Sequence, residues 1–230
     1  MDAAARVSVV AALIAEPARA RMLNALMRGE AMTATELALL ARVSAQTASS
    51  HLGAMREAGL VTMDKQGRSR YYALAGPAVA EALEALQVLA ADGAQPGYRA
   101  ALRAEPLRLA RTCYDHLAGM LGVAITEAMV RRGHLKPRGA DFILRPAGER
   151  FFSQLGVNVA AVRAKHRRFA RQCLDWSERR PHLAGSLGAA LANRCFELGW
   201  LERVAASRVV SVTKRGRAAI GETFALTAPF

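Results

Sequence analysis

The sequence predicts a mainly α-helical protein with small β-wings, an α+β fold made of two domains. Three observations predict it. Apolar residues recur at helical spacing before a short hairpin pattern in the first 92 residues. A segment rich in helix breakers follows at residues 91–97, and one heptapeptide occurs twice, almost unchanged, in the second half. At 230 residues the chain is long enough for two small domains with separate cores, which we place at residues 1–92 and 98–230.

The first domain contains a segment with the order helix, turn, helix and hairpin. Apolar residues at Leu37 and Leu40 mark the first helix, and Ser44 occupies the position of an N-cap for the second. Gly59 ends the second helix, and two alternating strands follow around a basic tip at residues 64–68. The strands are predicted at residues 60–63 and 69–74. This order predicts a winged helix-turn-helix.

The second of these helices has an outward face of small polar side chains. Ala48, Leu52 and Met55 form its inward stripe. Serine and threonine are mediocre helix formers, so their clustering favours a partner that docks closely, such as base edges and phosphates in a major groove. The side chains predicted to contact DNA are Ser44, Gln46, Thr47, Ser49, Ser50 and His51 on the helix, and Lys65, Arg68 and Arg70 on the wing.

Several short motifs in this domain are typical of one family. They are Glu16-Pro17-Ala18-Arg19, Thr35-Glu36-Leu37-Ala38, Ser49-Ser50-His51-Leu52, Ala58-Gly59-Leu60-Val61, and Gly67-Arg68 followed by Tyr71-Tyr72. In this order they resemble the ArsR/SmtB-type bacterial transcriptional regulators. The resemblance implies a homodimer that binds an operator with two recognition helices and two wings, usually as a repressor released by an effector.

The metal sites of that family are missing from the sequence. Thr33, Ala34 and Thr35 occupy the segment where some members carry a cysteine pair. Other members place ligands on the helix after the wing, and here residues 77–86 contain no histidine. The resemblance therefore implies no metal at the family sites, and any effector must bind elsewhere.

The net charge of +13 lies entirely in the second domain. Residues 1–92 hold nine basic and nine acidic residues, whereas the remaining residues hold 23 and 10. This excess predicts phosphate contacts that flank the duplex, an anionic effector, or only a solvated basic face.

The first and last helices of the first domain are expected to help to form the dimer. They span residues 3–15, with Val7, Val10, Leu13 and Ile14 facing inward, and residues 79–89. No apolar run approaches the roughly 18 residues needed to cross a bilayer, and the three cysteines are far apart in sequence. We therefore expect a cytoplasmic protein with reduced thiols and no membrane partner.

The second domain is duplicated internally. Residues 116–122 and 182–188 differ at one position of seven, and a shift of 66 residues aligns them. The repeats span about residues 113–152 and 179–220. Each is predicted to contain a helix, a glycine at its end, a strand or hairpin and a second helix. That is the latter part of a winged helix, so we predict a degenerate winged-helix-like domain that serves sensing or assembly.

The repeated heptapeptide is predicted to be helical, with its glycines allowing two helices to cross closely and His116 and His182 near one approximate axis. Cys113 and His116, three apart on such a helix, could offer sulfur and nitrogen to a metal ion, which residues of the second repeat would complete. The candidate effector or metal residues are Cys113, His116, Cys173, Asp175, Trp176, Arg179 and His182.

Three other interpretations stay open for these residues. The histidines could only cap their helices. A pocket for a small molecule or an anion could lie between the repeats, with walls from Tyr114, Trp176, Arg179 and Arg180. Cys113 or Cys173 could sense redox state. Cys195 is interpreted as a buried small apolar residue. A basic helix is also predicted over residues 157–175.

An enzyme is not favoured, because the sequence has no glycine-rich phosphate loop and neither an H-E-x-x-H nor a G-x-S-x-G motif. The predicted function is a sequence-specific DNA-binding transcriptional regulator, a repressor whose second domain responds to an effector or stabilises assembly. No cofactor is assigned beyond a possible metal ion or small-molecule effector. The alternative is an architectural protein that binds DNA without an effector.

Overall fold

The computed structural model describes residues 2–67, 69–93, 105–205 and 207–227. The chain divides into two compact units, Met1–Leu86 and Gln87–Phe230, which are called unit 1 and unit 2. The predicted domain boundary falls mainly on residues outside the described part, so the division between residues 92 and 98 stays a prediction. Within the described ranges, no helix is both long and apolar enough to cross a membrane.

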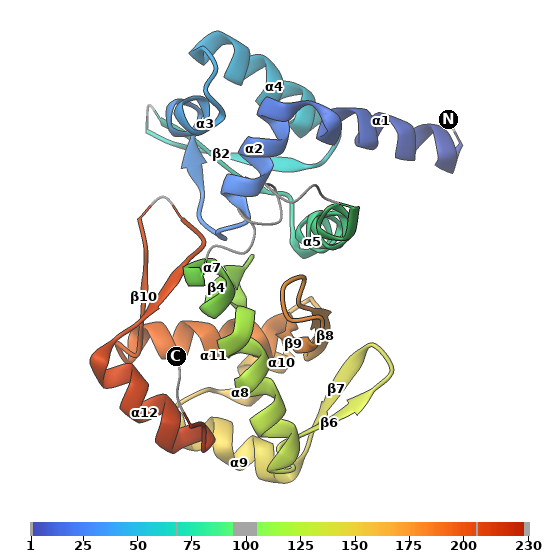
Figure 1. The fold of residues 1–230 in the computed structure, drawn as a ribbon. Helices are drawn as coiled ribbons and strands as arrows, with labels where there is room; N and C mark the ends of the chain where they lie inside the picture. Colours follow the sequence, from blue (N-terminus) through green and yellow to red (C-terminus); the bar gives the residue numbers. More distant parts are fainter. Residues whose placement is uncertain (1, 68, 94–104, 206, 228–230) are drawn as a thin grey trace. The chain divides into compact units, whose positions relative to one another are not determined.

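Unit 1 has the order of elements that the sequence predicts for a winged helix-turn-helix (Figure 1). The strands form one sheet in the order β1-β3-β2, and β1 was not predicted. The helices are α1 (Ala3–Ala15), α2 (Pro17–Leu26), α3 (Ala34–Ala41), α4 (Ala45–Glu57) and the start of α5 (Pro77–Gly93). The strands are β1 (Met32–Thr33), β2 (Val61–Gln66) and β3 (Ser69–Leu74).

Local capping sets the turn between α3 and α4. Thr33 and Glu36 form a capping box at the start of α3. Arg42 ends α3 in the left-handed region with φ of 57°. Ser44 then caps α4 by accepting a hydrogen bond of 3.1 Å from the Thr47 backbone N–H. The core of the unit includes the fully buried residues Met22, Leu23, Leu37, Leu52 and Met55.

The wing is longer than predicted and its tip is shorter. Strand β2 continues to Gln66, which pairs with Ser69, so only two residues remain for the turn. Gly67, with φ of 59°, supplies the backbone conformation that such a turn needs. Residues 64–66, predicted as part of the tip, therefore belong to the strand.

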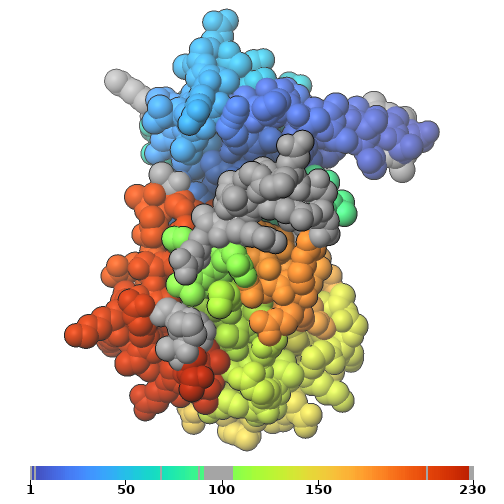
Figure 2. Space-filling model, viewed as in Figure 1, coloured from blue at the N-terminus to red at the C-terminus, as the bar shows by residue number. Residues whose placement is uncertain are grey.

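Helix α1 extends beyond the rest of unit 1 as a single rod (Figure 2). Its apolar side chains are poorly covered, with Val7 68% and Val9 48% exposed. The prediction that Val7 faces inward is wrong, whereas Val10, Leu13 and Ile14 are half-buried. Arg19 holds the end of this helix, because its guanidinium donates to the carbonyl oxygens of Ala12 and Leu13.

In unit 2 the same six elements occur twice. The first set is β4 (Arg111–Cys113), β5 (His116–Ala118), α8 (Gly119–Arg131), β6 (Leu135–Arg138), β7 (Asp141–Leu144) and α9 (Pro146–Gln154). The second is β8 (Arg171–Leu174), β9 (Pro181–Ala184), α11 (Gly185–Glu197), β10 (Leu201–Arg203), β11 (Val210–Val212) and α12 (Lys214–Phe224). The short helices α7 (Glu105–Leu109) and α10 (Val159–Arg163) precede them. Each set contains the predicted helix, hairpin and helix, and adds a hairpin in front.

The two repeats exchange hairpins. Strand β7 of the first repeat pairs with β8 of the second, through Asp141 opposite Arg171, in a sheet with the order β6-β7-β8-β9. In the equivalent place, β4 of the first repeat meets the second repeat through Arg111 opposite Val209. Two backbone N–H to carbonyl hydrogen bonds flank each junction. They are 2.8 and 2.9 Å long beside Asp141 and Arg171, and both are 2.9 Å long beside Arg111 and Val209. The repeats are therefore related by an approximate two-fold arrangement.

The predicted helix over the repeated heptapeptide is wrong at its first three residues. His116-Leu117-Ala118 and His182-Leu183-Ala184 are strands, and each helix begins at the next glycine. Gly119 and Gly185 have φ of 79° and 78°, which a residue with a side chain rarely adopts. A Cβ on Gly122 or Gly188 would lie 2.5 or 2.3 Å from the carbonyl oxygen of Leu117 or Leu183. The glycines thus permit close packing of helix on strand and not, as predicted, of helix on helix.

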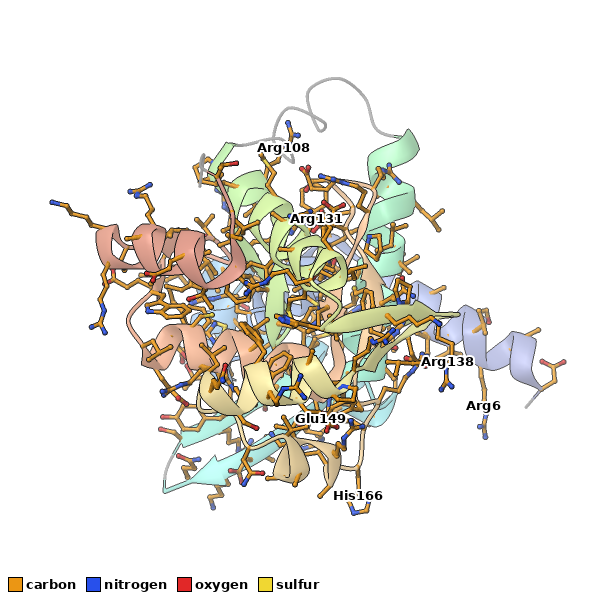
Figure 3. All side chains as sticks on the ribbon, turned by 90° about the horizontal axis from the view of Figure 1, so that it is seen from below. Arg6, Arg108, Arg131, Arg138, Glu149 and His166 are labelled. Atoms are coloured by element: carbon orange, nitrogen blue, oxygen red, sulfur yellow. The ribbon has the colours of Figure 1, made fainter. Side chains whose placement is uncertain are left out.

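The predicted basic helix over residues 157–175 is also wrong. Helix α10 ends at Arg163, and a turn and bends lead to strand β8, which forms because pairing with β7 and β9 satisfies its backbone. Part of the basic charge is neutralised locally, since Arg163 pairs with Glu149 and Arg168 with Asp141. Figure 3 shows His166 and Arg138 pointing away from the unit.

Close packing at Gly216 gives a test of the fold. A Cβ on Gly216 of α12 would lie 1.9 Å from the Trp200 carbonyl oxygen, whereas a Cβ on Gly53 of α4 would meet no atom within 4 Å. Gly216→Ala should therefore destabilise unit 2 by about 1–3 kcal/mol or more. Gly53→Ala should stabilise unit 1 by roughly 0.5–1 kcal/mol, because alanine favours the helix.

Urea denaturation of both variants measures these changes. Equal stability of Gly216→Ala and the parent chain would contradict the packing of α12 described above.

Candidate functional site

The predicted reading face of α4 lies on the surface of unit 1. Ser44, Gln46, Thr47, Ser49 and Ser50 are all exposed. The opposite side of the helix is anchored, because its inward residues Ala48, Leu52 and Met55 are fully buried. The helix therefore presents a short row of hydroxyl and amide groups from a fixed position, which suits readout of base edges.

His51 differs from the other predicted contacts. Its ring lies between α4 and the start of α2, with Nδ1 3.3 Å from the Arg19 guanidinium and Nε2 3.5 Å from a Glu16 carboxylate oxygen. It is half-buried, because position 51 is at the border of the buried stripe. Glu16 also accepts hydrogen bonds from the backbone N–H groups of Ala18 and Arg19, which lower the pKa of Glu16. The structure thus gives His51 a role in holding α4 on α2.

Two basic side chains lie opposite each other on the wing. Lys65 and Arg70 are partners in the β2–β3 register, and both are exposed. Like charges in directly opposed positions disfavour the hairpin slightly, so their presence favours an anionic partner. Arg68, the third predicted wing contact, lies outside the described residues.

Four candidate residues of unit 2 converge on one point. Cys113 lies opposite His116 in the β4–β5 register, and Cys173 lies opposite His182 in the β8–β9 register. The two histidine Nε2 atoms are 3.2 Å apart, and the two cysteine Sγ atoms are 3.9 Å apart. All four potential ligand atoms lie within 4.8 Å of one another. These residues are called the Cys₂His₂ cluster.

The Cys₂His₂ cluster is largely shielded from solvent. Cys113, His116 and His182 are 2%, 6% and 1% exposed, and Cys173 is half-buried. The predicted meeting of His116 and His182 near one axis is confirmed, with ring centroids 5.1 Å apart. The predicted helical spacing of Cys113 and His116 is wrong, since a tight hairpin turn, not a helix, brings them to one face. Tyr114 holds this turn with φ of 59°.

An arginine and a carboxylate stand behind each histidine. Asp115 lies 3.3 Å from His116 Nδ1 and is held by the Arg167 guanidinium. Asp175 lies 3.5 Å from His182 Nδ1 and accepts two hydrogen bonds of 2.9 Å from Arg111. The exchange of hairpins thus produces the order arginine, aspartate, histidine on both sides of the cluster.

These surroundings change the protonation of the cluster. Burial opposes the charged imidazolium of His116, but the hydrogen bond to Asp115 and the contact with Cys173 outweigh it and raise the pKa of His116 to about 9. The neighbouring Cys113 thiol and the two histidines lower the pKa of Cys173 against the effect of its burial. The cluster thus favours a thiolate at Cys173. Cys195 is the opposite case, because burial raises its pKa to about 12.

The remaining candidates do not belong to the cluster. Asp175 is fully buried, and it also accepts hydrogen bonds from the Gly119 and Ser177 backbone N–H groups. Burial alone would raise the pKa of Asp175, but the Arg111 guanidinium and then His182 keep it well below its usual range. Trp176 packs under Arg111, whose guanidinium carbon lies 4.2 Å from the ring centroid. Arg179 lies in the β8–β9 turn and is exposed.

Sequence reasoning missed Arg111, Asp115 and Arg167 as supports of the two histidines. A signal for Asp115 was present, because an aspartate directly precedes His116. Arg111 and Arg167 gave no such signal, because both are far from their aspartates in sequence. Arg111 is 64 residues from Asp175, and Arg167 is 52 residues from Asp115.

The geometry of unit 1, a capped helix with a polar outer face followed by a basic wing, defines the class of DNA-binding helix-turn-helix proteins. A family model of a helix-turn-helix domain matches residues 14–64. The HTH-type transcriptional regulator YdfF of Bacillus subtilis is 41% identical over 213 residues, which cover 93% of this chain and 94% of the relative. The chain therefore belongs to the HTH-type transcriptional regulators, and it carries a helix-turn-helix DNA-binding domain.

Two solved structures are similar to the first part of the chain. One is the homodimeric winged helix-turn-helix domain of Mb0332 from Mycobacterium bovis, described as a possible ArsR-family regulator. It is 28% identical, covers 39% of this chain and 82% of its own, and has a TM-score of 0.37. The other is HlyU from Vibrio cholerae. It is 26% identical, covers 39% of this chain and 97% of its own, and has a TM-score of 0.35.

The Arg111–Asp175 pair gives a second test of stability. Both side chains are fully buried, so Asp175→Ala leaves an uncompensated charge on Arg111 and should lower the free energy of unfolding by about 3–5 kcal/mol. Glu149→Ala removes one partner of an exposed pair and should cost no more than about 1 kcal/mol.

Denaturant unfolding of the two variants, followed through the fluorescence of Trp176 and Trp200, measures both values. Similar small losses in the two variants would contradict a structural role for the buried pair.

Proposed function

We propose that this regulator is a repressor that binds a two-fold symmetric operator as a homodimer, and that its second unit responds to an effector. The single observation that carries the DNA-reading part is the row of exposed polar side chains on α4, between Ser44 and Ser50. The opposite side of this helix is buried in the core of unit 1. We place its action on DNA in the cytoplasm.

Base readout is assigned to Gln46, Thr47, Ser49 and Ser50. An amide such as that of Gln46 can bond an adenine edge with two hydrogen bonds, and hydroxyl groups accept either kind of partner. Ser44 keeps its oxygen engaged with Thr47, both through the backbone N–H and through a contact of 2.8 Å between the two hydroxyl groups. Its role is therefore to cap the helix next to a phosphate.

The homodimer is proposed through the apolar surface of α1 and α5. Val7 and Val9 on α1, and Leu86 on α5, are 44% to 68% exposed. Large apolar side chains grouped on two helices favour coverage by another protein surface. We assign this surface to a second copy of the chain, because a homodimer with its reading helices about one turn of B-form DNA apart, roughly 34 Å, would match two half-sites.

The effector response is assigned to unit 2. It is built around a shielded cluster of ionisable side chains that the reading of DNA does not use. Buried groups with shifted pKa values concentrate at functional sites, which supports a sensing role for this unit.

Selection of bound duplexes from a random pool tests base reading. The parent chain should enrich a two-fold symmetric sequence. The double variant Gln46→Ala/Ser50→Ala should bind that sequence more weakly by roughly 1–3 kcal/mol for each base that it no longer reads, while its affinity for random DNA changes little.

The matched control is Gln154→Ala/Ser153→Ala, which changes the same residue types at exposed positions of α9 in unit 2. Equal losses on enriched and random DNA in the α4 variant would favour an architectural DNA-binding protein and refute base reading.

Removal of the wing charges tests phosphate contact. Lys65→Ala/Arg70→Ala should weaken binding to every duplex and should reduce the slope of log affinity against log salt by about 1.8, or 0.9 for each phosphate that is no longer neutralised. Fluorescence anisotropy across a salt series measures the slope.

The matched control is Lys214→Ala/Arg215→Ala, which removes the same charge as the wing variant from exposed positions of α12. A wing variant with an unchanged salt slope would refute the assigned role of Lys65 and Arg70.

A further inference from the structure

We infer that the Cys₂His₂ cluster is a zinc site that joins the two repeats of unit 2 across their approximate two-fold axis. Cys113 and His116 supply two ligands from the β4–β5 hairpin, and Cys173 and His182 supply two from the β8–β9 hairpin. The site lies outside the family metal positions and does not depend on the proposed function, because it concerns metal binding by unit 2 alone.

The separations between like atoms fit tetrahedral coordination. Zinc–sulfur bonds of about 2.3 Å and zinc–nitrogen bonds of about 2.0–2.1 Å place two sulfurs roughly 3.8 Å apart and two nitrogens roughly 3.3 Å apart in a tetrahedron. The corresponding distances are 3.9 Å and 3.2 Å. The widest separation of 4.8 Å exceeds the roughly 3.5 Å of a sulfur–nitrogen edge, and rotation about the cysteine χ1 angles reduces it.

The positions of the two histidine rings favour a cation between them. Both Nδ1 atoms face an aspartate, 3.3 Å away for His116 and 3.5 Å away for His182. Each aspartate is paired with an arginine, which holds its carboxylate beside the ring. The two Nε2 atoms face each other over 3.2 Å, so one metal ion can bind both of them.

The arrangement behind the histidines is the one that zinc sites use. A carboxylate that accepts the second ring N–H of a histidine fixes its tautomer and its orientation toward the metal. Asp115 is placed to do so for His116, within hydrogen-bond distance, and Asp175 lies 3.5 Å from the Nδ1 atom of His182. Arg167 and Arg111 hold the two aspartates. Two thiolates and two imidazoles favour zinc over the hard cations, which prefer oxygen ligands.

Four protein ligands leave no open position for a substrate, so the site is a closed one that holds the two repeats together, and an effector other than the ion would have to bind elsewhere in unit 2. Its ligands come from segments about 60 residues apart, and each hairpin belongs to a different repeat. Zinc therefore adds a bond between repeats that otherwise meet through exchanged strands and packed side chains.

Metal analysis of the full chain tests the inference. The protein is purified under reducing conditions without a histidine tag, incubated with zinc and then freed of loosely bound metal with a weak chelator. Mass spectrometry with inductively coupled plasma should find one zinc per chain, and zinc should raise the melting temperature. Cobalt in place of zinc should give thiolate-to-metal charge transfer and the intense visible bands of a tetrahedral centre.

Variants assign the ligands. Cys173→Ser and His116→Asn should lose the zinc and the tetrahedral cobalt spectrum. The matched controls Cys195→Ala and His166→Asn, which change a buried cysteine and an exposed histidine outside the cluster, should retain both. Asp115→Asn should still bind zinc, with an affinity lower by about 10–100-fold, because it weakens the support of His116 and leaves all four ligands in place.

Circular dichroism separates loss of metal from loss of fold, and Asp115→Asn supplies a milder change if a ligand variant unfolds. A folded parent chain that retains no zinc would overturn the inference. So would unchanged zinc content in the Cys173 and His116 variants, or a Cys113–Cys173 disulfide as the stable form of the protein under reducing conditions.

Discussion

The exchange of hairpins between two repeats is the constraint on which unit 2 depends. Each repeat places its first hairpin beside the second hairpin of the other, at Asp141 opposite Arg171 and at Arg111 opposite Val209. The exchange brings β5 and β9 together, and with them two histidines that are 66 residues apart in sequence. Because neither repeat can complete its sheet or the Cys₂His₂ cluster alone, the duplication behaves as a dimer built into one chain.

The two units place their polar side chains differently. In unit 1, α4 buries one narrow stripe and leaves hydroxyl and amide groups exposed, so its surface is available to a duplex. In unit 2, charged and nucleophilic side chains are turned inward, and Arg111 and Asp175 are fully buried. Two hydrogen bonds from the Arg111 guanidinium to Asp175 offset part of the cost of burying this pair, and they join the two hairpins. In the proposed regulator, the surface assigned to reading DNA is thus separate from the interior assigned to the effector response.

Local patterns were sufficient to predict the helices, the Ser44 cap and the hairpin of unit 1, since these rest on neighbours in sequence, but not the two-residue strand β1. Unit 2 was predicted only in part. The shift of 66 residues matched His116 with His182 but hid the match of Cys113 with Cys173, which are 60 residues apart because the β8–β9 turn is longer. Strands of three residues around Tyr114 carry too little periodicity to be distinguished from a helix. Exchange between repeats, and the reach of Arg167 to Asp115, depend on tertiary packing that no local pattern contains.

X-ray absorption at the zinc edge tests the central claim about unit 2 most directly, because it reports the atoms around the metal in the folded chain. The account predicts two sulfurs at about 2.3 Å and two nitrogens at about 2.0–2.1 Å. A shell made only of oxygen and nitrogen would contradict the joining of the two repeats through Cys113, His116, Cys173 and His182.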